Sequence, residues 1–242
     1  PQGMYRSADS PSRSLRTAPV DDGELLLVGG NGHVVGRSSS PQAAVDALEA
    51  WTRQHFPGAE RTHAWSAQDY RSANLIPFVG TLPRGGGNIY LATGFNKWGL
   101  TNGVSAALRI SAQILGGAAD WARPMDRRLT SPADLLTGLK DNATVGTRLA
   151  GGWASAARRP LPQEPPAEGQ GIVGRDHGWP VAVSTVDGVT CRMSAVCTHL
   201  GGIVSWNDAE RSWDCPLHGS RFAADGSLLE GPAVKDLPRP GR

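Results

Sequence analysis

Two short Cys/His pairs near the C-terminus constrain this chain more than any other feature of its sequence. The first pair lies in Cys197-Thr198-His199, and the second, fifteen residues further on, lies in Cys215-Pro216-Leu217-His218. Thiolates and neutral imidazoles are side chains that transition metals prefer, and both pairs lie in glycine- or proline-containing turns. The spacing therefore predicts one metal centre with four ligands: Cys197, His199, Cys215 and His218.

A [2Fe-2S] cluster of the Rieske type suits one Cys-x-His and one Cys-x-x-His, with two thiolates on one iron and two imidazoles on the other. The neutral imidazoles reduce the negative charge of the cluster and so raise its reduction potential. The alternatives are a structural zinc site and unrelated core Cys and His residues. Zinc modules usually open with paired cysteines, so the Cys-x-His start favours the cluster. The chain is therefore predicted to carry single electrons.

The residues around these ligands resemble the two cluster-binding loops of the Rieske ferredoxin family. The resemblance covers Cys197 to Gly202 and Cys215 to Ser220. It implies that the Ser220 hydroxyl donates a hydrogen bond to a bridging sulfide of the cluster.

Three positions depart from the pattern of many high-potential family members. Those members have a disulfide between cysteines at the positions of Gly202 and Leu217, and a tyrosine at the position of Phe222. The tyrosine donates a hydrogen bond to a ligand sulfur. The resemblance therefore implies a potential at the lower, ferredoxin-like end of the Rieske range.

Composition limits the other functions. A net charge of +2 with dispersed basic residues predicts no nucleic-acid partner. No apolar stretch approaches the roughly 20 residues of a membrane-spanning helix, so no membrane span is expected. Cys191 is the one cysteine outside the ligand set and is expected to be a buried, inert thiol. Because no disulfide framework exists, a cytoplasmic location is predicted.

The N-terminal part of the chain is predicted to contain a hairpin and a helix. Glu24–Val28 and His33–Arg37 are short apolar-rich runs on either side of an Asn-Gly turn. The helix should begin with Ser40 as its N-cap and Pro41 at its first position, and should end near Phe56.

A second strand-turn-helix unit follows further along the chain. Asn88–Gly94 has the pattern of a buried strand, and apolar residues recur with helical period from Val104 to Leu115. The glycine-rich turn between them leads into the positive end of the helix. Such a turn suits an anion or an electron-rich ring edge.

Several segments look like the C-terminal half of FAD-dependent amine and amino-acid oxidoreductases of the glycine oxidase and D-amino-acid dehydrogenase type. They are Gly3–Ser7, Ser14–Pro19, Ile76–Gly80 and Gly94–Gly103. The order of parts is similar to bacterial members that carry a Rieske domain at the C-terminus. The resemblance implies that the flavin ring contacts Gly94, Trp98, Gly99, Leu100 and Thr101. Lys97 is either a cation that tunes the flavin or a solvated lysine.

Two features of the oxidoreductase family are missing. No Gly-x-Gly-x-x-Gly fingerprint lies between a strand and a helix with an acidic residue about 20 positions further on. We therefore expect the main FAD-binding half to lie upstream, and this portion to be inactive by itself. Relatives of glycine oxidase place a carboxylate-binding arginine where this chain has Asp69, with Arg71 two residues later. The substrate therefore stays open.

The predicted fold class is α+β, with a truncated FAD-oxidoreductase domain followed by a small antiparallel all-β Rieske domain. The expected boundaries are 1–120 for the oxidoreductase part, 121–160 for a helical connector with a turn at Gly151-Gly152, and 161–242 for the Rieske domain. The predicted function is oxidation of a C–N bond in an amine or amino-acid-type substrate, with electrons passed through the cluster to an accepting protein or carrier. The alternative is an electron-transfer module without catalysis of its own, serving a separate oxygenase or reductase.

Overall fold

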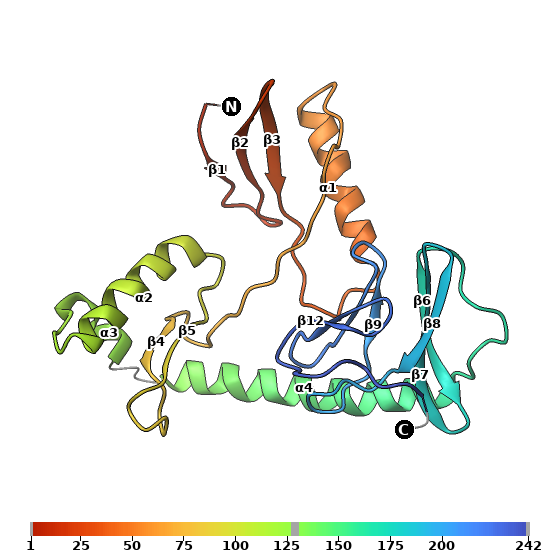
Figure 1. Ribbon diagram of the computed structural model, residues 1–242. Coiled ribbons are helices and arrows are strands. Elements are labelled where there is room, and N and C mark those ends of the chain that lie inside the picture. The colour runs from red at the N-terminus through yellow and green to blue at the C-terminus, as the bar shows by residue number, and fades with distance from the viewer. Residues whose placement is uncertain (1, 127–130, 241–242) are drawn as a thin grey trace. The chain divides into compact units, whose positions relative to one another are not determined.

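The structure is a computed structural model that describes residues 2–126 and 131–240 (Figure 1). The chain forms two compact units. One combines the residues up to Ser66 with those from Val145 onward, and the other is Ala67–Thr144. Each unit is described by itself.

An antiparallel sheet opens the first unit. Its strands, in spatial order, are β1 (Tyr5–Arg6), β2 (Ser14–Val20) and β3 (Gly23–Gly29). The predicted hairpin is wrong in its partner, because Glu24–Val28 lies within β3 and pairs with β2 before it. His33–Arg37 forms a turn rather than a strand. The reason is tertiary: Gly36 and Arg37 form hydrogen bonds with residues near the C-terminus instead of with a neighbouring strand.

Helix α1 (Pro41–His55) confirms the predicted helix and its cap. The Ser40 hydroxyl accepts a hydrogen bond from the Ala43 N–H at 3.1 Å. This bond satisfies one of the backbone donors that a helix start leaves unpaired, and proline at the first position has no N–H to satisfy. Phe56 caps the other end.

The C-terminal part of the first unit contains two antiparallel sheets. One sheet consists of β6 (Gln170–Asp176), β7 (Trp179–Val186) and β8 (Val189–Ser194). The other consists of β9 (Ser205–Asn207), β10 (Ser212–Asp214), β11 (Arg221–Ala223) and β12 (Leu228–Glu230). The predicted fold class is confirmed: a mixed α/β part precedes a small antiparallel β domain.

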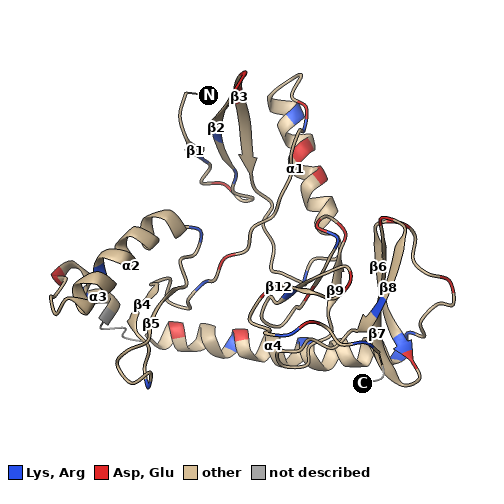
Figure 2. Cartoon of the chain, viewed as in Figure 1, with Lys and Arg blue, Asp and Glu red and all other residues tan. Residues whose placement is uncertain are grey.

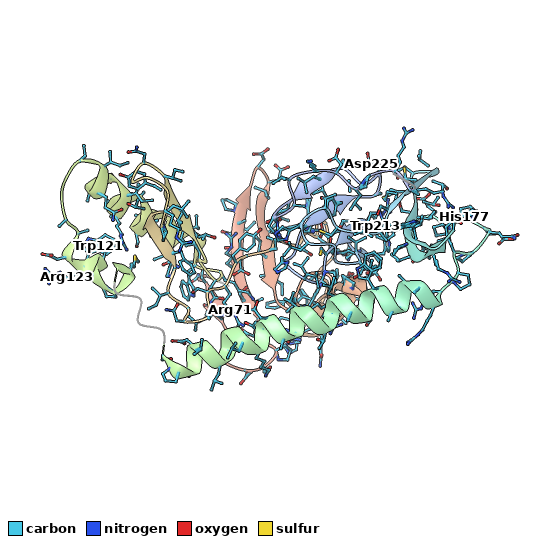
Figure 3. The ribbon with its side chains drawn as sticks, turned by 90° about the horizontal axis from the view of Figure 1, so that it is seen from below. Arg71, Trp121, Arg123, His177, Trp213 and Asp225 are labelled. Carbon is cyan, nitrogen blue, oxygen red and sulfur yellow. The ribbon has the colours of Figure 1, made fainter. Side chains whose placement is uncertain are left out.

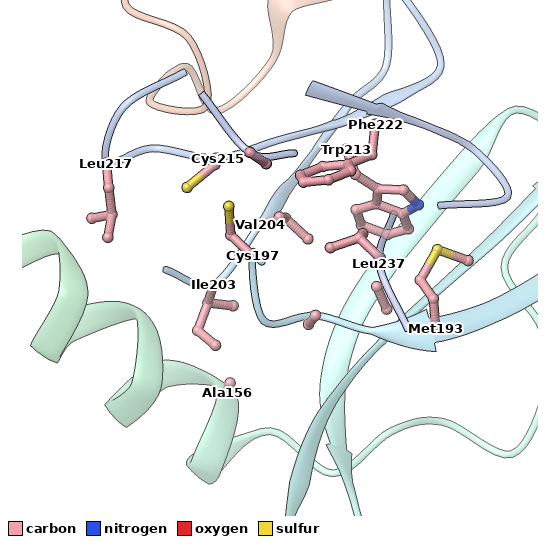
Figure 4. Packing of buried hydrophobic residues seen from close by; sticks show 13 residues of the cluster. Ala156, Met193, Cys197, Ile203, Val204, Trp213, Cys215, Leu217, Phe222 and Leu237 are labelled. Atoms are coloured by element: carbon pink, nitrogen blue, oxygen red, sulfur yellow. The ribbon is translucent and has the colours of Figure 1, made fainter. Parts of the chain in front are cut away.

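The core of this domain surrounds Trp213, which is fully buried (Figure 3). Its indole packs edge-on against Trp206 with the ring centroids 4.7 Å apart. Phe222 and Met193 complete the interior, and the same cluster includes Cys197 and Cys215 (Figure 4). The two cysteines among the predicted metal ligands are therefore part of the hydrophobic core.

Helix α4 (Pro132–Arg158) corrects the predicted turn at Gly151-Gly152, because both glycines lie inside the helix. A Cβ atom on Gly152 would lie 3.3 Å from the Cβ of Ile203. Gly152 therefore allows the helix to approach the domain closely and does not form the predicted turn. The Trp153 indole N–H donates to the Gly201 carbonyl at 2.9 Å, so this end of α4 contacts the loop after β8.

The second unit contains a hairpin and short helices. Its elements are β4 (Phe78–Thr81), β5 (Tyr90–Thr93), α2 (Gly99–Ile114), the 3-10 turn η1 (Asp120–Ala122) and α3 (Arg123–Asp126). β4 and β5 pair antiparallel, and both contact α2. The strand-turn-helix order predicted for residues 88–115 is confirmed. The strand β5 is not buried as expected, because Tyr90 and Leu91 are half-buried and Ala92 and Thr93 are exposed. Helix α2 begins at Gly99, five residues earlier than expected.

Charged residues of both signs occur along α1 and along α4 (Figure 2). This mixture agrees with the small net charge of the sequence. Within residues 2–126 and 131–240, no helix is both long enough and apolar enough to cross a bilayer.

Candidate metal centre

The first ligand pair lies in a tight loop between β8 and β9. The Cys197 N–H donates to the Gly202 carbonyl at 2.8 Å, and the Gly201 N–H donates back to the Cys197 carbonyl at 3.0 Å. Gly201 has φ of 73°, in the left-handed region that favours glycine. This bonding folds the chain around His199, which lies at the exposed tip of the loop.

The second ligand pair lies in a loop with the same bonding pattern. The Cys215 N–H donates to the Ser220 carbonyl at 2.8 Å, and the Gly219 N–H donates to the Cys215 carbonyl at 3.0 Å. Gly219 has φ of 81°, again left-handed. Each loop therefore presents a buried cysteine at its base and an exposed histidine further along, although the two pairs differ in spacing by one residue.

The two cysteine side chains lie together in the core, each 2% exposed (Figure 4). A hydrogen bond from the Cys215 thiol is the largest cause that lowers the pKa of Cys197, to about 6. The same bond, together with burial, raises the pKa of Cys215. The lowered pKa of Cys197 favours its thiolate, which is the form that binds metal.

The two imidazoles form a second pair. The rings of His199 and His218 meet edge to face with their centroids 5.0 Å apart. Burial, then the charge of His199, then that of Arg37, lower the pKa of His218. A lowered pKa favours the neutral imidazole, which is the form that binds metal.

The four predicted ligands are arranged as two pairs of like side chains. Thiol pairs with thiol and imidazole with imidazole, as a [2Fe-2S] cluster with unlike irons requires. Among the residues that the structure describes, no group of three or more His, Cys, Asp or Glu side chains is placed to hold a single metal ion. The geometry brings together all four predicted ligands.

Ser220 lies beside the cysteine pair and is fully buried. Its hydroxyl donates to the Cys197 sulfur, which contributes to the lowered pKa of that thiol, and accepts from the Ala233 N–H at 3.0 Å. The hydroxyl is therefore aimed at the sulfur-rich side of the site. Cys191 is only partly buried and lies on β8, outside the ligand set.

The residues predicted to contact a flavin ring lie together in the second unit, from the end of β5 into the first turn of α2. Gly94 is buried with φ of 77°, whereas Trp98 is 57% exposed and Leu100 is 92% exposed. Gly99, Leu100 and Thr101 are the first residues of α2, and no side chain caps this end among the described residues. After the buried Gly94, the segment therefore forms an exposed surface. The backbone N–H groups at the start of α2 have no side-chain cap there.

Arg71 lies next to this segment, which the sequence spacing had not shown. Its backbone forms an isolated antiparallel bridge with Phe95, and the Asn96 N–H donates to the Tyr70 carbonyl at 3.1 Å. Arg71 is exposed (labelled in Figure 3). A guanidinium is thus carried on the chain segment adjacent to Gly94, whereas the position expected for such a group is held by Asp69.

One glycine spacing needs a separate explanation. Gly169, Gly171 and Gly174 have the Gly-x-Gly-x-x-Gly spacing, but Gly169 precedes strand β6, the other two lie inside it, and the next element is strand β7 rather than a helix. A Cβ atom on Gly171 would overlap the Trp206 indole, and one on Gly174 would lie 2.9 Å from the backbone of Leu161. These two glycines serve packing, not nucleotide binding.

Comparisons with known proteins assign the two regions separately. A family model described as FAD dependent oxidoreductase matches residues 1–113, and the Rieske [2Fe-2S] domain model matches residues 165–240. The Rieske 2Fe-2S iron-sulfur protein YhfW of Bacillus subtilis (strain 168) is 34% identical over 98% of this chain and 47% of its own length. The chain thus spans about half the length of that relative.

Other relatives match a smaller part of the chain. The cytochrome b6-f complex iron-sulfur subunit of Synechococcus sp. (strain JA-2-3B'a(2-13)) is 31% identical over 48% of this chain and 80% of the subunit. The solved structure of the cyanobacterial plasma membrane Rieske protein PetC3 from Synechocystis PCC 6803 matches 28% of this chain and 71% of its own, with 38% identity and a TM-score of 0.27.

Proposed function

We propose that this chain is part of a flavin-dependent oxidoreductase that passes electrons singly through a [2Fe-2S] cluster. The chain belongs to the Rieske [2Fe-2S] domain family through residues 165–240, and its residues 1–113 match the FAD dependent oxidoreductase family model. The proposed substrate is an amine or amino-acid-type molecule oxidised at a C–N bond. The observation that carries the electron-transfer part is the pairing of thiol with thiol and imidazole with imidazole.

The proposed cluster ligands are Cys197 and Cys215 for one iron and His199 and His218 for the other. When bound, the [2Fe-2S] cluster supplies one-electron transfer. Water is kept from the sulfur side of the centre, because both cysteines are buried in the hydrophobic core together with Ile203 and Leu217. Ser220 donates a hydrogen bond on this side and so stabilises negative charge there.

The two histidines give the proposed centre its contact with partners. Both are exposed, and Leu200 next to His199 is 60% exposed. An electron-accepting protein or carrier can therefore approach the imidazole edges without displacing the core.

The proposed flavin site is the segment that holds Gly94, Trp98, Gly99, Leu100 and Thr101. Support comes from the uncapped start of α2, where backbone N–H groups and the helix dipole stabilise negative charge on a ring edge. Arg71 is the proposed partner for a substrate carboxylate, since it lies beside this segment and guanidinium binds carboxylate with two hydrogen bonds.

The cluster is tested by spectroscopy of the purified chain. We expect equal amounts of iron and sulfide and, after reduction with dithionite, the EPR signal of a Rieske centre. His199→Ala and Cys215→Ser should each abolish the signal, because each removes a ligand. Cys191→Ser and His177→Ala are matched controls, since Cys191 lies outside the ligand set and the His177 side chain is 96% exposed (Figure 3). Stoichiometric zinc without sulfide would overturn the assignment.

The flavin site is tested by FAD binding. The 242-residue chain offers an exposed ring-side surface, so we expect it to bind FAD weakly, and a longer protein that adds a dinucleotide fingerprint to copurify with FAD. In that longer protein Trp98→Ala should weaken FAD binding, whereas Trp121→Ala, which changes another exposed tryptophan, should not. A longer protein that retains the cluster and binds no FAD would support an electron-transfer module without catalysis of its own.

A further inference from the structure

The segment between β3 and α1 lies directly against the second cluster loop. The Ser205 hydroxyl donates to the Gly36 carbonyl at 2.9 Å, and the Arg37 Nε–H donates to the Pro216 carbonyl at 2.8 Å. In Figure 4 the orange ribbon of this segment passes beside the loop that carries Cys215 and Leu217. Arg37 and Pro216 are 179 residues apart, and they belong to the same compact unit.

The contact is close enough to exclude any side chain at position 36. A Cβ atom on Gly36 would lie 2.7 Å from the Pro216 nitrogen, and 2.8 Å from both the Asp214 oxygen and the Cys215 carbonyl carbon. Gly36 also has φ of 67°, which other residues rarely adopt. The backbone of the oxidoreductase-related region therefore packs on the backbone of a proposed cluster ligand.

A second set of bonds anchors the same segment. The Ser40 hydroxyl and the Gln42 N–H each lie 2.8 Å from the carboxylate of Asp208, in the turn after β9. Ser205 is the first residue of β9, and Asp208 directly follows this strand. The bonds to Gly36, Ser40 and Gln42 therefore attach the segment to β9 at two points. Arg37 is thus fixed from both sides.

Arg37 is partly buried, and its guanidinium donates a hydrogen bond to the Pro216 carbonyl. Among the described residues no carboxylate forms an ion pair with it, so its positive charge is not neutralised by a neighbour. The guanidinium bonds to Pro216, which lies between Cys215 and His218 in the sequence, so its charge is held on the segment that carries two of the proposed ligands. A fixed cation at this place favours whichever state of the centre is more negative.

We propose that Arg37, supplied by the oxidoreductase-related region, is a positioning residue for the second cluster loop and raises the reduction potential of the cluster. The inference rests on the proposed cluster. The guanidinium holds the loop through the Pro216 carbonyl, and its charge stabilises the reduced cluster, which carries one more electron. The oxidoreductase-related region therefore raises the driving force for electron transfer from its proposed flavin site to the cluster.

The test is redox titration of the 242-residue chain, followed by EPR and by protein-film voltammetry. Arg37→Gln removes the charge and keeps a donor that reaches towards the carbonyl, so the midpoint potential should fall. Arg37→Lys keeps the charge, so its potential should stay near that of the wild-type protein. Arg53→Gln is the matched control, because Arg53 pairs with Glu49 on α1, and it should leave the potential unchanged.

The outcomes separate this inference from the proposed function. A wild-type chain without a Rieske EPR signal would overturn the proposed cluster itself. A normal signal with equal midpoint potentials in the wild-type and Arg37→Gln proteins would overturn the role of Arg37 and leave the cluster standing. If Arg37→Gln loses the cluster and Arg37→Lys retains it at the wild-type potential, the positioning role is supported. An equal fall of the midpoint potential in Arg37→Gln and Arg37→Lys would contradict the role of the charge.

Discussion

Gly202 and Leu217 face each other across the two cluster loops. A Cβ atom on Gly202 would lie 2.7 Å from both Cγ and Cδ1 of Leu217, and 3.0 Å from the sulfur of Cys215. Leu217 is 6% exposed and fills the space that the missing Cβ leaves. These are the positions at which the resemblance to high-potential Rieske proteins would place a disulfide, and in this chain apolar packing joins the loops there.

This relationship predicts that Gly202→Cys/Leu217→Cys forms a disulfide. The bridge would close a loop of about 15 residues, for which the entropic model gives about 3 kcal/mol of added stability. Thermal unfolding with and without reductant, together with a free-thiol count, measures it. Gly202→Cys alone should be less stable than wild type because its side chain collides with Leu217. A double variant with both new thiols free would show that the two positions do not face each other.

Phe222→Tyr should raise the midpoint potential of the cluster. Phe222 is fully buried in the cluster of residues that contains both cysteines, and a hydroxyl there would donate to a ligand sulfur. Such a bond stabilises the more negative, reduced state. A net gain of about 1 kcal/mol corresponds to roughly 40 mV for one electron. Protein-film voltammetry at one pH measures the shift, and an unchanged or lower potential would mean that the side chain does not reach the sulfur.

Two adjacent glycines of α4 should respond in opposite directions to the same substitution. Gly152 faces Ile203 at 3.3 Å, whereas a Cβ atom on Gly151 meets nothing within 4 Å. Gly152→Leu should lower the free energy of unfolding by about 1–3 kcal/mol because it overpacks this contact. Gly151→Leu should raise it by up to about 1 kcal/mol because leucine favours the helix. Urea unfolding of both variants measures the two changes in the free energy of unfolding. Equal changes would mean that the face of α4 that carries Gly152 does not pack against the domain.

Glu168 should make part of the stability depend on pH. Its carboxylate accepts hydrogen bonds from the N–H groups of Asp187 and Gly188 at 2.8 and 3.0 Å, and the bond from Gly188 is the main cause that lowers its pKa. Because the folded-state pKa lies below the unfolded one, the stabilisation is complete above the ordinary carboxylate range. It is lost as pH falls through the lowered folded-state pKa.

Glu168→Gln should therefore unfold at a lower temperature than wild type near neutral pH, and the gap should shrink on acidification to about pH 3. Melting curves across this range measure the gap. Glu164→Gln, at another exposed glutamate on the lead-in to the same domain, should show no pH-dependent gap. A Glu168→Gln gap that stays constant with pH would mean that the charge of the carboxylate contributes nothing to these bonds.

Local patterns in the sequence were sufficient for several parts of the fold. Ser40 and Pro41 predicted the start of α1 because capping depends on neighbouring residues only. His33–Arg37 was misjudged because its bonding partners are Ser205 and Pro216, far along the chain. Gly151-Gly152 was misjudged for a similar reason, since glycine in a turn and glycine at a close contact have the same local pattern.

The sequence by itself determined the chemistry of the proposed centre, because the residue types and spacing of Cys197, His199, Cys215 and His218 are local properties that metal preference makes specific. Only the tertiary structure put the two cysteines in the core and the two histidines at exposed loop positions, and placed Arg37 on the loop of Cys215. Contacts between residues more than a hundred positions apart leave no periodic or spacing signal. They form only when separate elements bury their apolar faces together and satisfy their backbone groups.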